Sequence, residues 1–234
     1  MKSHFILLLI LAFVACGCSS TRRMVAQSRA NAIPANEMTR AIVIESAKSP
    51  VAGLLDVKHV VVIARDALDV QGAATQWPQP PTPELDLATR HFIESHLQRA
   101  MMEKGYRAAN RMNVIPVRME RSFPLGDMSV ADLRALVKPH HMLLCTRVRQ
   151  NISPERYLWD RGSRSDNREF HLGERITYCF TLELLSCNTS EPLWTATATV
   201  DSVFKQVPDR LHLLRAIVEE LVARVPPAQG LVTK

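Results

Sequence analysis

The chain has 234 residues, of which 47% are hydrophobic and 22% are charged. These proportions are typical of a globular protein and exclude an intrinsically disordered chain. The formal net charge is +6, but Lys2 lies in the N-terminal leader, and five cations face two anions between Ser19 and Lys48. Because the remainder carries little net charge, the sequence predicts no basic face and no nucleic-acid partner.

The amino terminus has the pattern of a secretory signal peptide. Lys2 precedes an apolar run from Phe5 to Ala15, and small residues follow. As a helix, a run of about eleven residues reaches about 16 Å, against about 30 Å for the hydrocarbon core of a bilayer. Residues 1–17 are therefore expected to be a leader that is removed, not a membrane span.

The stretch FVACGCSST resembles the lipobox of bacterial lipoproteins, in which a cysteine thiol is acylated and becomes the new amino terminus. Two registers fit, with acylation at Cys16 or at Cys18, and Cys18 is slightly preferred. Three acyl chains, at about 0.8 kcal/mol for each buried CH₂, would hold the protein on a membrane without a spanning segment. No Asp follows either cysteine, which by the same resemblance favours a periplasm-facing position on the outer membrane. An ordinary secreted protein with cysteines in its leader is the alternative.

The middle of the chain alternates between strand and helix signals. Residues 18–55 are predicted to form a tether with one weak element near Ile42. A β-branched run over Val57–Asp66 predicts a strand buried on both faces. Four prolines within residues 78–83 predict a loop, and apolar residues at three- and four-residue steps predict a helix from Glu84 to Lys104 that ends at Gly105. Short extended pieces are expected at 106–109 and 113–117.

The second half reads as helix, three strands and helix. Ser129 opens a helix that runs to Val137, and a strand follows over 140–152. Period-two alternation over 176–184 and 194–200 predicts an antiparallel hairpin with one solvated face. Glu183 and Asp201 are placed on that face among threonines, and a last helix is expected from Asp209 to Val225.

Together these elements predict an α/β fold, an α+β sandwich with a mixed sheet of about five strands and helices packed on it. The domain is expected over residues 56–226, with a tail over 227–234. Of the cysteines beyond the leader, Cys145, Cys179 and Cys187, we expect free thiols, with Cys145 as the one that could pair with either of the others.

The element order and several short motifs resemble the domain shared by the TolB amino-terminal region, the curli-secretion lipoprotein CsgG and the penicillin-binding-protein activator LpoB. These motifs are VVVIARD, MEKGY, SVADLRALVKPHH, MLLCTRV and YCFTLELLSCNTSEPLWTA. The last keeps the Leu, Thr, Glu and Trp of the family's hairpin but lacks its Asp and Gly. The resemblance covers about Val57 to Val225 and implies an envelope partner, which could be a cell-wall synthase, a transport assembly or copies of the same chain.

The polar segment from Ser153 to Gly173 is the candidate partner-binding site, predicted to be a long connecting loop. Its four arginines are balanced by four acidic residues, which suits protein contact better than a polyanion. The candidate contact residues are Tyr157, Trp159, Arg161, Arg164 and Phe170. A connecting loop without a binding role is the alternative reading of the segment.

The sequence predicts no catalytic residues, no metal site and no cofactor, because the histidine spacings and the common catalytic motifs do not fit. The resulting hypothesis is a non-enzymatic, lipid-anchored accessory protein. The alternative is a periplasmic enzyme or small-ligand carrier with a site under the 153–173 segment. A pore would need long alternating strands, and we expect none.

Overall fold

The computed structural model describes residues 24, 27–29, 31–47, 57–66, 85, 87–115, 128–159, 168–188 and 192–228, with the backbone alone at 46, 47, 157–159, 168 and 169. The elements in chain order are η1 (Ala35–Ala41), β1 (Ile42–Ala47), β2 (His59–Asp66), α2 (Leu87–Glu103), β3 (Arg107–Asn110), η3 (Arg111–Asn113), α4 (Val130–Val137), β4 (His141–Trp159), β5 (Arg168–Leu185), β6 (Pro192–Phe204) and α5 (Arg210–Ala223).

The strands form one mixed sheet in the order β1-β6-β5-β4-β2-β3. Strand β2 runs parallel to both β3 and β4, and the other neighbours are antiparallel. The α/β fold is confirmed, with six strands instead of about five. The weak element expected near Ile42 is β1, which pairs with β6 at the edge of the sheet.

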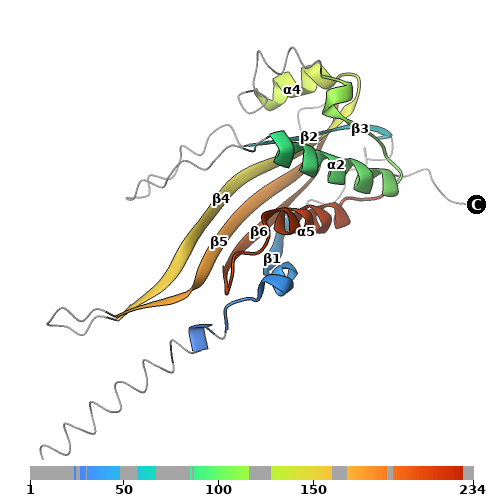
Figure 1. The fold of residues 1–234 in the computed structure, drawn as a ribbon. Coiled ribbons are helices and arrows are strands. Elements are labelled where there is room, and N and C mark those ends of the chain that lie inside the picture. The colour runs from blue at the N-terminus through green and yellow to red at the C-terminus, as the bar shows by residue number, and fades with distance from the viewer. Residues whose placement is uncertain are drawn as a thin grey trace, which may run out of the picture.

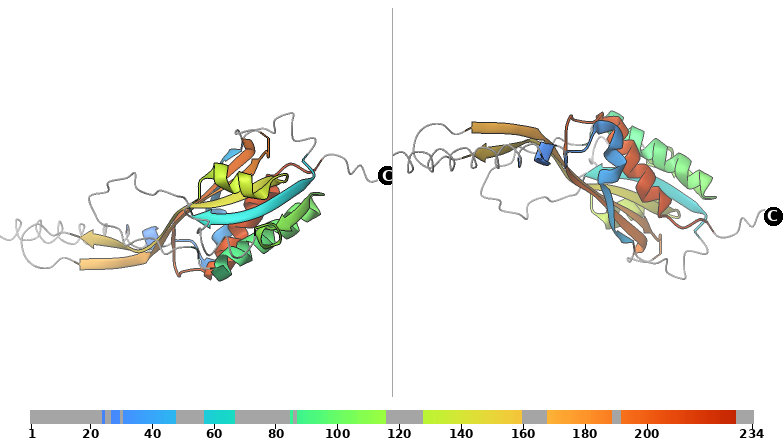
Figure 2. Two further views of the ribbon diagram at one scale, coloured as in Figure 1. Left: turned by 90° about the horizontal axis from the view of Figure 1, so that it is seen from above. Right: turned by 90° about the horizontal axis from the view of Figure 1, so that it is seen from below.

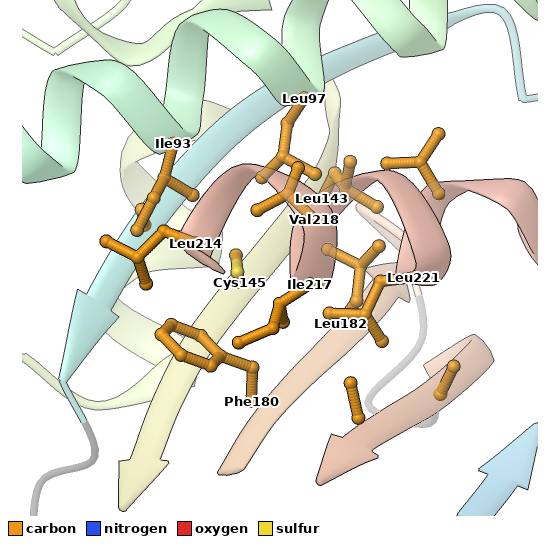
Figure 3. Packing of buried hydrophobic residues seen from close by; sticks show 14 of the residues in the cluster. Ile93, Leu97, Leu143, Cys145, Phe180, Leu182, Leu214, Ile217, Val218 and Leu221 are labelled. Carbon is orange, nitrogen blue, oxygen red and sulfur yellow. The ribbon is translucent and has the colours of Figure 1, made fainter. Parts of the chain in front are cut away.

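Helices cover both faces of the sheet unequally (Figures 1 and 2). Helices α2 and α5 lie on one face over the larger core, which takes residues from β2, β4, β5 and β6 (Figure 3). Helix α4 covers part of the opposite face, where Leu133 and Val137 pack on β2 and β4. Lys104, just after α2, links this helix to α5. Its ammonium donates to the carbonyl oxygens of Ala223 and Val225 at the end of α5.

The strand patterns in the sequence correspond to the burial in the structure. Strand β2 is buried from Val60 to Ala64, as expected for a strand covered on both faces. On β5 and β6 the aromatic and aliphatic members of the alternation are buried, and the threonines point to the other, half-exposed side. The predicted hairpin is therefore confirmed, including its antiparallel register.

The helix boundaries follow the predicted caps. Gly105 has φ of 89° and ends α2, since this left-handed conformation is costly for other residues. Ser129 and Asp132 form a reciprocal capping box at the start of α4. The Asp209 carboxylate accepts from the amide of His212 at the start of α5.

Some details differ from the expectation. The α2 stripe includes the polar residues Thr89 and Glu94, both of which are buried. Leu211, in the first turn of α5, is 45% exposed. The prediction of an extended piece at 113–117 is wrong for its described part, because Asn113 ends the 3₁₀ helix η3 and residues 114 and 115 form a turn and a bend. Residues 116 and 117 and the proline-rich loop lie outside the described residues.

Candidate functional site

Strands β4 and β5 continue well beyond the strands that flank them (Figure 1). Pairing of β4 with β2 ends at Asp66–Arg147, and pairing of β5 with β6 ends at Glu174–Phe204. Beyond these points, in the described part of the chain, β4 and β5 pair only with each other, as far as Trp159 and Arg168. We call this two-stranded extension, residues 155–159 and 168–173, the arm.

The prediction of a connecting loop over Ser153–Gly173 is wrong for most of that segment. Residues 153–159 and 168–173 are paired strands, so the connection is confined to the residues between them. The two strands are long, since β4 spans 19 residues and β5 spans 18. The sequence did not indicate these strands because the segment is charged and lacks hydrophobic alternation. Neither face of a two-stranded ribbon in water needs to be apolar.

Gly173 marks the point at which the arm leaves the sheet. Its φ is +151°, and a Cβ at this position would lie 2.3 Å from the carbonyl oxygen of Phe204. A side chain here would collide with backbone, so only glycine lets β5 pass this close to the end of β6. The register of β4 with β5 shifts at the same point, because Glu155 pairs with Gly173 and Arg156 pairs with His171, which leaves Leu172 of β5 as the extra residue.

A group of ion pairs spans the root of the arm. Arg175 on β5 donates to Glu155 on β4 at 3.1 Å and to Asp201 on β6 at 2.8 Å. The hydrogen bond to Glu155, followed by the other contacts with the two carboxylates, raises the pKa of Arg175. Because these side chains are about half exposed, each pair contributes at most about 1 kcal/mol, and their main effect is to align three strands.

The segment that precedes η1 is fastened to the same root. The amide of Ile33 donates to the carbonyl oxygen of Val203 at 2.8 Å, and the amide of Lys205 donates to that of Ile33 at 3.0 Å. Arg29 Nε donates to the carbonyl oxygen of His171 within the arm at 3.0 Å. Ala32 between them is buried. We call Arg29, Ala32 and Ile33 the clasp.

A crevice of about 320 Å³ lies between the clasp and the root of the arm. Its lining residues are Ser28, Asn31, Ala32, Ile33, Glu155, Leu172, Ser202 and Val203. Glu155 is the one ionisable residue in this lining, and it is already paired with Arg175. The lining offers hydroxyl and amide groups for hydrogen bonding but no set of acid, base and nucleophile.

The candidate contact residues fall in different places. Tyr157 is opposite Phe170 in the arm, and Trp159 is opposite Arg168 at its described end. Phe170 is partly buried. Arg161 and Arg164 lie outside the described residues, as do Cys16 and Cys18.

The solvated sheet face holds Glu183 and Asp201, as expected. Asp201 accepts from Thr177 as well as from Arg175, and Glu183 is half-buried beside the threonines of β6. Burial raises the pKa of Glu183, and the positive charge of Arg65 opposes the shift. Arg65 itself is buried and donates to the carbonyl oxygen of Met128 at 2.6 Å.

The cysteines are free thiols, as expected. Cys145 is buried, and Cys179 and Cys187 are partly exposed. Among the described residues no group of three or more His, Cys, Asp or Glu residues is placed to hold a metal ion. In the same part of the chain, no helix is both long enough and apolar enough to cross a membrane.

No protein-family model and no curated protein matches the chain. Among solved structures, a PelC dodecamer from Paraburkholderia phytofirmans is similar over 80% of this chain and 99% of that chain, with 13% identity and a TM-score of 0.39. A Helicobacter pylori protein described as a homolog of neuraminyllactose-binding hemagglutinin is similar over 76% and 92%, with 10% identity and a TM-score of 0.35. These identities and TM-scores are too low to transfer a function.

Proposed function

We propose that this chain is a non-enzymatic, lipid-anchored protein of the bacterial envelope that uses its arm to bind another envelope protein. The lipid on Cys18 or Cys16 holds it on the periplasmic side of the outer membrane. The single observation that carries the proposal is the arm, a ribbon of two strands that leaves the sheet and has no other strand beside it in the described chain.

The physical reason is the weakness of such a ribbon by itself. A lone two-stranded hairpin is at best marginally stable in water, because it buries little apolar surface and leaves both edges unpaired. Here the chain orders it with Gly173, with the ion pairs of Arg175 and with the clasp. A ribbon that is ordered in this way presents backbone and side-chain groups for a partner that supplies the missing contacts.

The charge of the segment favours a protein partner. Arginines and acidic residues balance each other over 153–173, and the segment also holds Tyr157, Trp159 and Phe170. Aromatic residues and arginine are enriched at the energetic centres of protein interfaces. The resemblance to the TolB amino-terminal, CsgG and LpoB domain supports the same class of partner, either another envelope protein or a second copy of this chain.

The arm can be tested by cross-linked affinity capture from native envelopes. In the test variant, residues 156–171 are replaced by a two-residue Asn-Gly turn, which closes the strands at the root. Glu219→Ala on the exposed side of α5 is the matched control, since the ion pair of Glu219 in the described chain is with Arg215 on its own helix. We expect the control to recover the wild-type partners and the shortened arm to lose them. Recovery of the same partners with both variants would show that the arm is not the binding site.

The anchor can be tested separately by metabolic labelling with a fatty-acid analogue. Cys18→Ala and Cys16→Ala are compared with the wild type, and we expect one of them to abolish label and membrane retention. Label that persists in both single variants would contradict acylation at this lipobox.

A small-ligand carrier is the second candidate, because the crevice lies beneath the arm where such a site was expected. Ser202→Trp would fill the crevice from β6 without removing any ion pair of the root. If the protein is a carrier, this variant loses function while partner capture by the arm is unchanged.

A further inference from the structure

The position of the clasp limits how the anchored protein can stand on its membrane. Arg29 and Ile33 hold the incoming chain at the root of the arm, at one end of β4. Helix α4 packs on Met142 and Leu144 at the other end of β4, which we call the head. The arm is therefore the end of the sheet to which the chain entering from the lipid is attached.

The tether is short. Arg29 comes eleven positions after Cys18, and a fully extended chain of eleven residues reaches at most about 40 Å. Acylation at Cys16 would extend this limit to about 47 Å. Residues 27–29 are helical in the described chain, and a helix rises less per residue than an extended chain, so about 40 Å is an upper limit on the distance of the root from the lipid at Cys18.

The inverted orientation does not fit these lengths. Fifteen residues of β4 separate His141 in the head from Arg156 in the arm, which is about 50 Å along the strand. With the head on the membrane, the tether would have to span about that distance to reach the clasp, which exceeds its limit of about 40 Å from Cys18 and is close to its limit of about 47 Å from Cys16. The tether lengths therefore favour an orientation with the arm nearer the membrane than the head.

We infer that the arm faces the membrane that carries the lipid, and that it binds the exposed surface of a protein embedded in that membrane. This inference rests on the proposed lipid anchor and on the proposed role of the arm. It adds the location and the class of the partner. In this orientation the head, not the arm, would contact a partner on the other side of the periplasm.

A protein fits the arm better than the lipid surface does. The four arginines of the 153–173 segment are balanced by four acids, so anionic headgroups gain no net attraction. Neither arm strand has a second strand beside it in the described chain, and unpaired backbone is not tolerated in the hydrocarbon region. The part of an embedded protein that lies outside the hydrocarbon can offer a strand edge to the backbone groups of the arm. It can also offer charged side chains to the arginines and acidic residues of the segment.

The orientation can be measured with the full lipidated chain on vesicles. A fluorescent donor is placed through an encoded azido residue at Arg156 in the arm or at Lys138 beside α4, which leaves the cysteines unchanged. Both positions are exposed. With acceptor dye on the lipid headgroups, we expect stronger energy transfer from position 156 than from position 138. Equal transfer, or stronger transfer from position 138, would overturn the orientation.

A lengthened tether provides the matched control. Insertion of about 30 Gly/Ser residues after Arg23 raises the maximum reach of the tether from Cys18 from about 40 Å to about 150 Å and makes the inverted orientation reachable. We expect the difference between the two donor positions to decrease in this variant. A difference that persists unchanged would show that the tether does not set the orientation.

The class of partner is tested by photo-cross-linking from position 156 in native envelopes. The inference requires a product with a different protein that remains in the membrane after carbonate extraction and that is absent when the cross-linker is at position 138. A product with a soluble protein or with a second copy would overturn the inference and leave the proposed function standing. Absence of any product from the arm would overturn both.

Discussion

Arg111 donates from Nε to Glu94 Oε1 across 2.7 Å, and both side chains are at most 1% exposed. The amide of Ala64 donates to the same oxygen at 3.0 Å. Pairing of β2 with β3 ends at Val62, so Glu94 satisfies an amide of β2 that no strand reaches. The carboxylate of the buried ion pair therefore accepts the hydrogen bond that a neighbouring strand would accept from β2 beyond the end of β3.

Glu94→Gln tests this role. The amide oxygen can still accept from Ala64, but the guanidinium loses the carboxylate that faces it. Breaking one side of a buried ion pair typically costs about 3–5 kcal/mol. We expect a fall of that size in the free energy of unfolding, measured by urea denaturation. Glu103→Gln is the control, because Glu103 and Arg99 are exposed and their pair contributes at most about 1 kcal/mol. Equal effects in the two variants would contradict the assignment.

Gly173→Ala tests the root of the arm. The added methyl group would meet the backbone of Phe204, and the positive φ disfavours any side chain. We expect a loss of about 1–3 kcal/mol, together with faster amide exchange at His171 and Phe204. Gly105→Ala at the end of α2 should cost a similar amount without changing exchange in the arm. If amide exchange at the root is unchanged in Gly173→Ala, the close approach of β5 to the backbone of Phe204 does not require glycine.

The pH dependence of stability should contain a contribution from Glu183. Burial raises its pKa in the folded state above the ordinary value of 4.5. Between these two values the folded protein binds more protons than the unfolded chain, so stability decreases as pH rises. Glu183→Gln removes this contribution, and we expect the variant to gain stability relative to wild type as pH rises above about 4.5. Parallel pH profiles, measured by denaturant unfolding, would contradict the burial effect.

The thiols of Cys187 and Cys145 should react at different stages, Cys187 in the native protein and Cys145 after unfolding. Burial raises the pKa of Cys145 to about 12, and the negative charge of Glu94 adds to the shift. The thiolate is the reactive form, so Cys145 should resist iodoacetamide at pH 8 until the protein unfolds. Cys187 is partly exposed and should be alkylated in the native state. Peptide mass mapping measures both, and alkylation of Cys145 before unfolding would contradict the packing.

The local elements could be predicted because their signals are local. The β-branched run of β2, the alternation of β5 and β6 and the caps at Gly105, Ser129 and Asp209 depend on neighbours within a few residues. Glu94 could not be assigned from α2, since its partners Ala64 and Arg111 come from other elements. A carboxylate on a helix is ordinarily solvated, and nothing within α2 marks this one as buried.

The sequence by itself determined the element order, the α/β class and the expectation of a lipid anchor, because periodicity, capping and the leader are properties of short stretches of chain. Only the tertiary structure decided that the segment after Ile152 continues as an arm, that Gly173 faces Phe204 and that Arg29 is fastened beside His171. The physical reason is that a solvated strand carries no hydrophobic alternation. Its existence depends on a partner strand and a backbone contact that lie far away in the sequence.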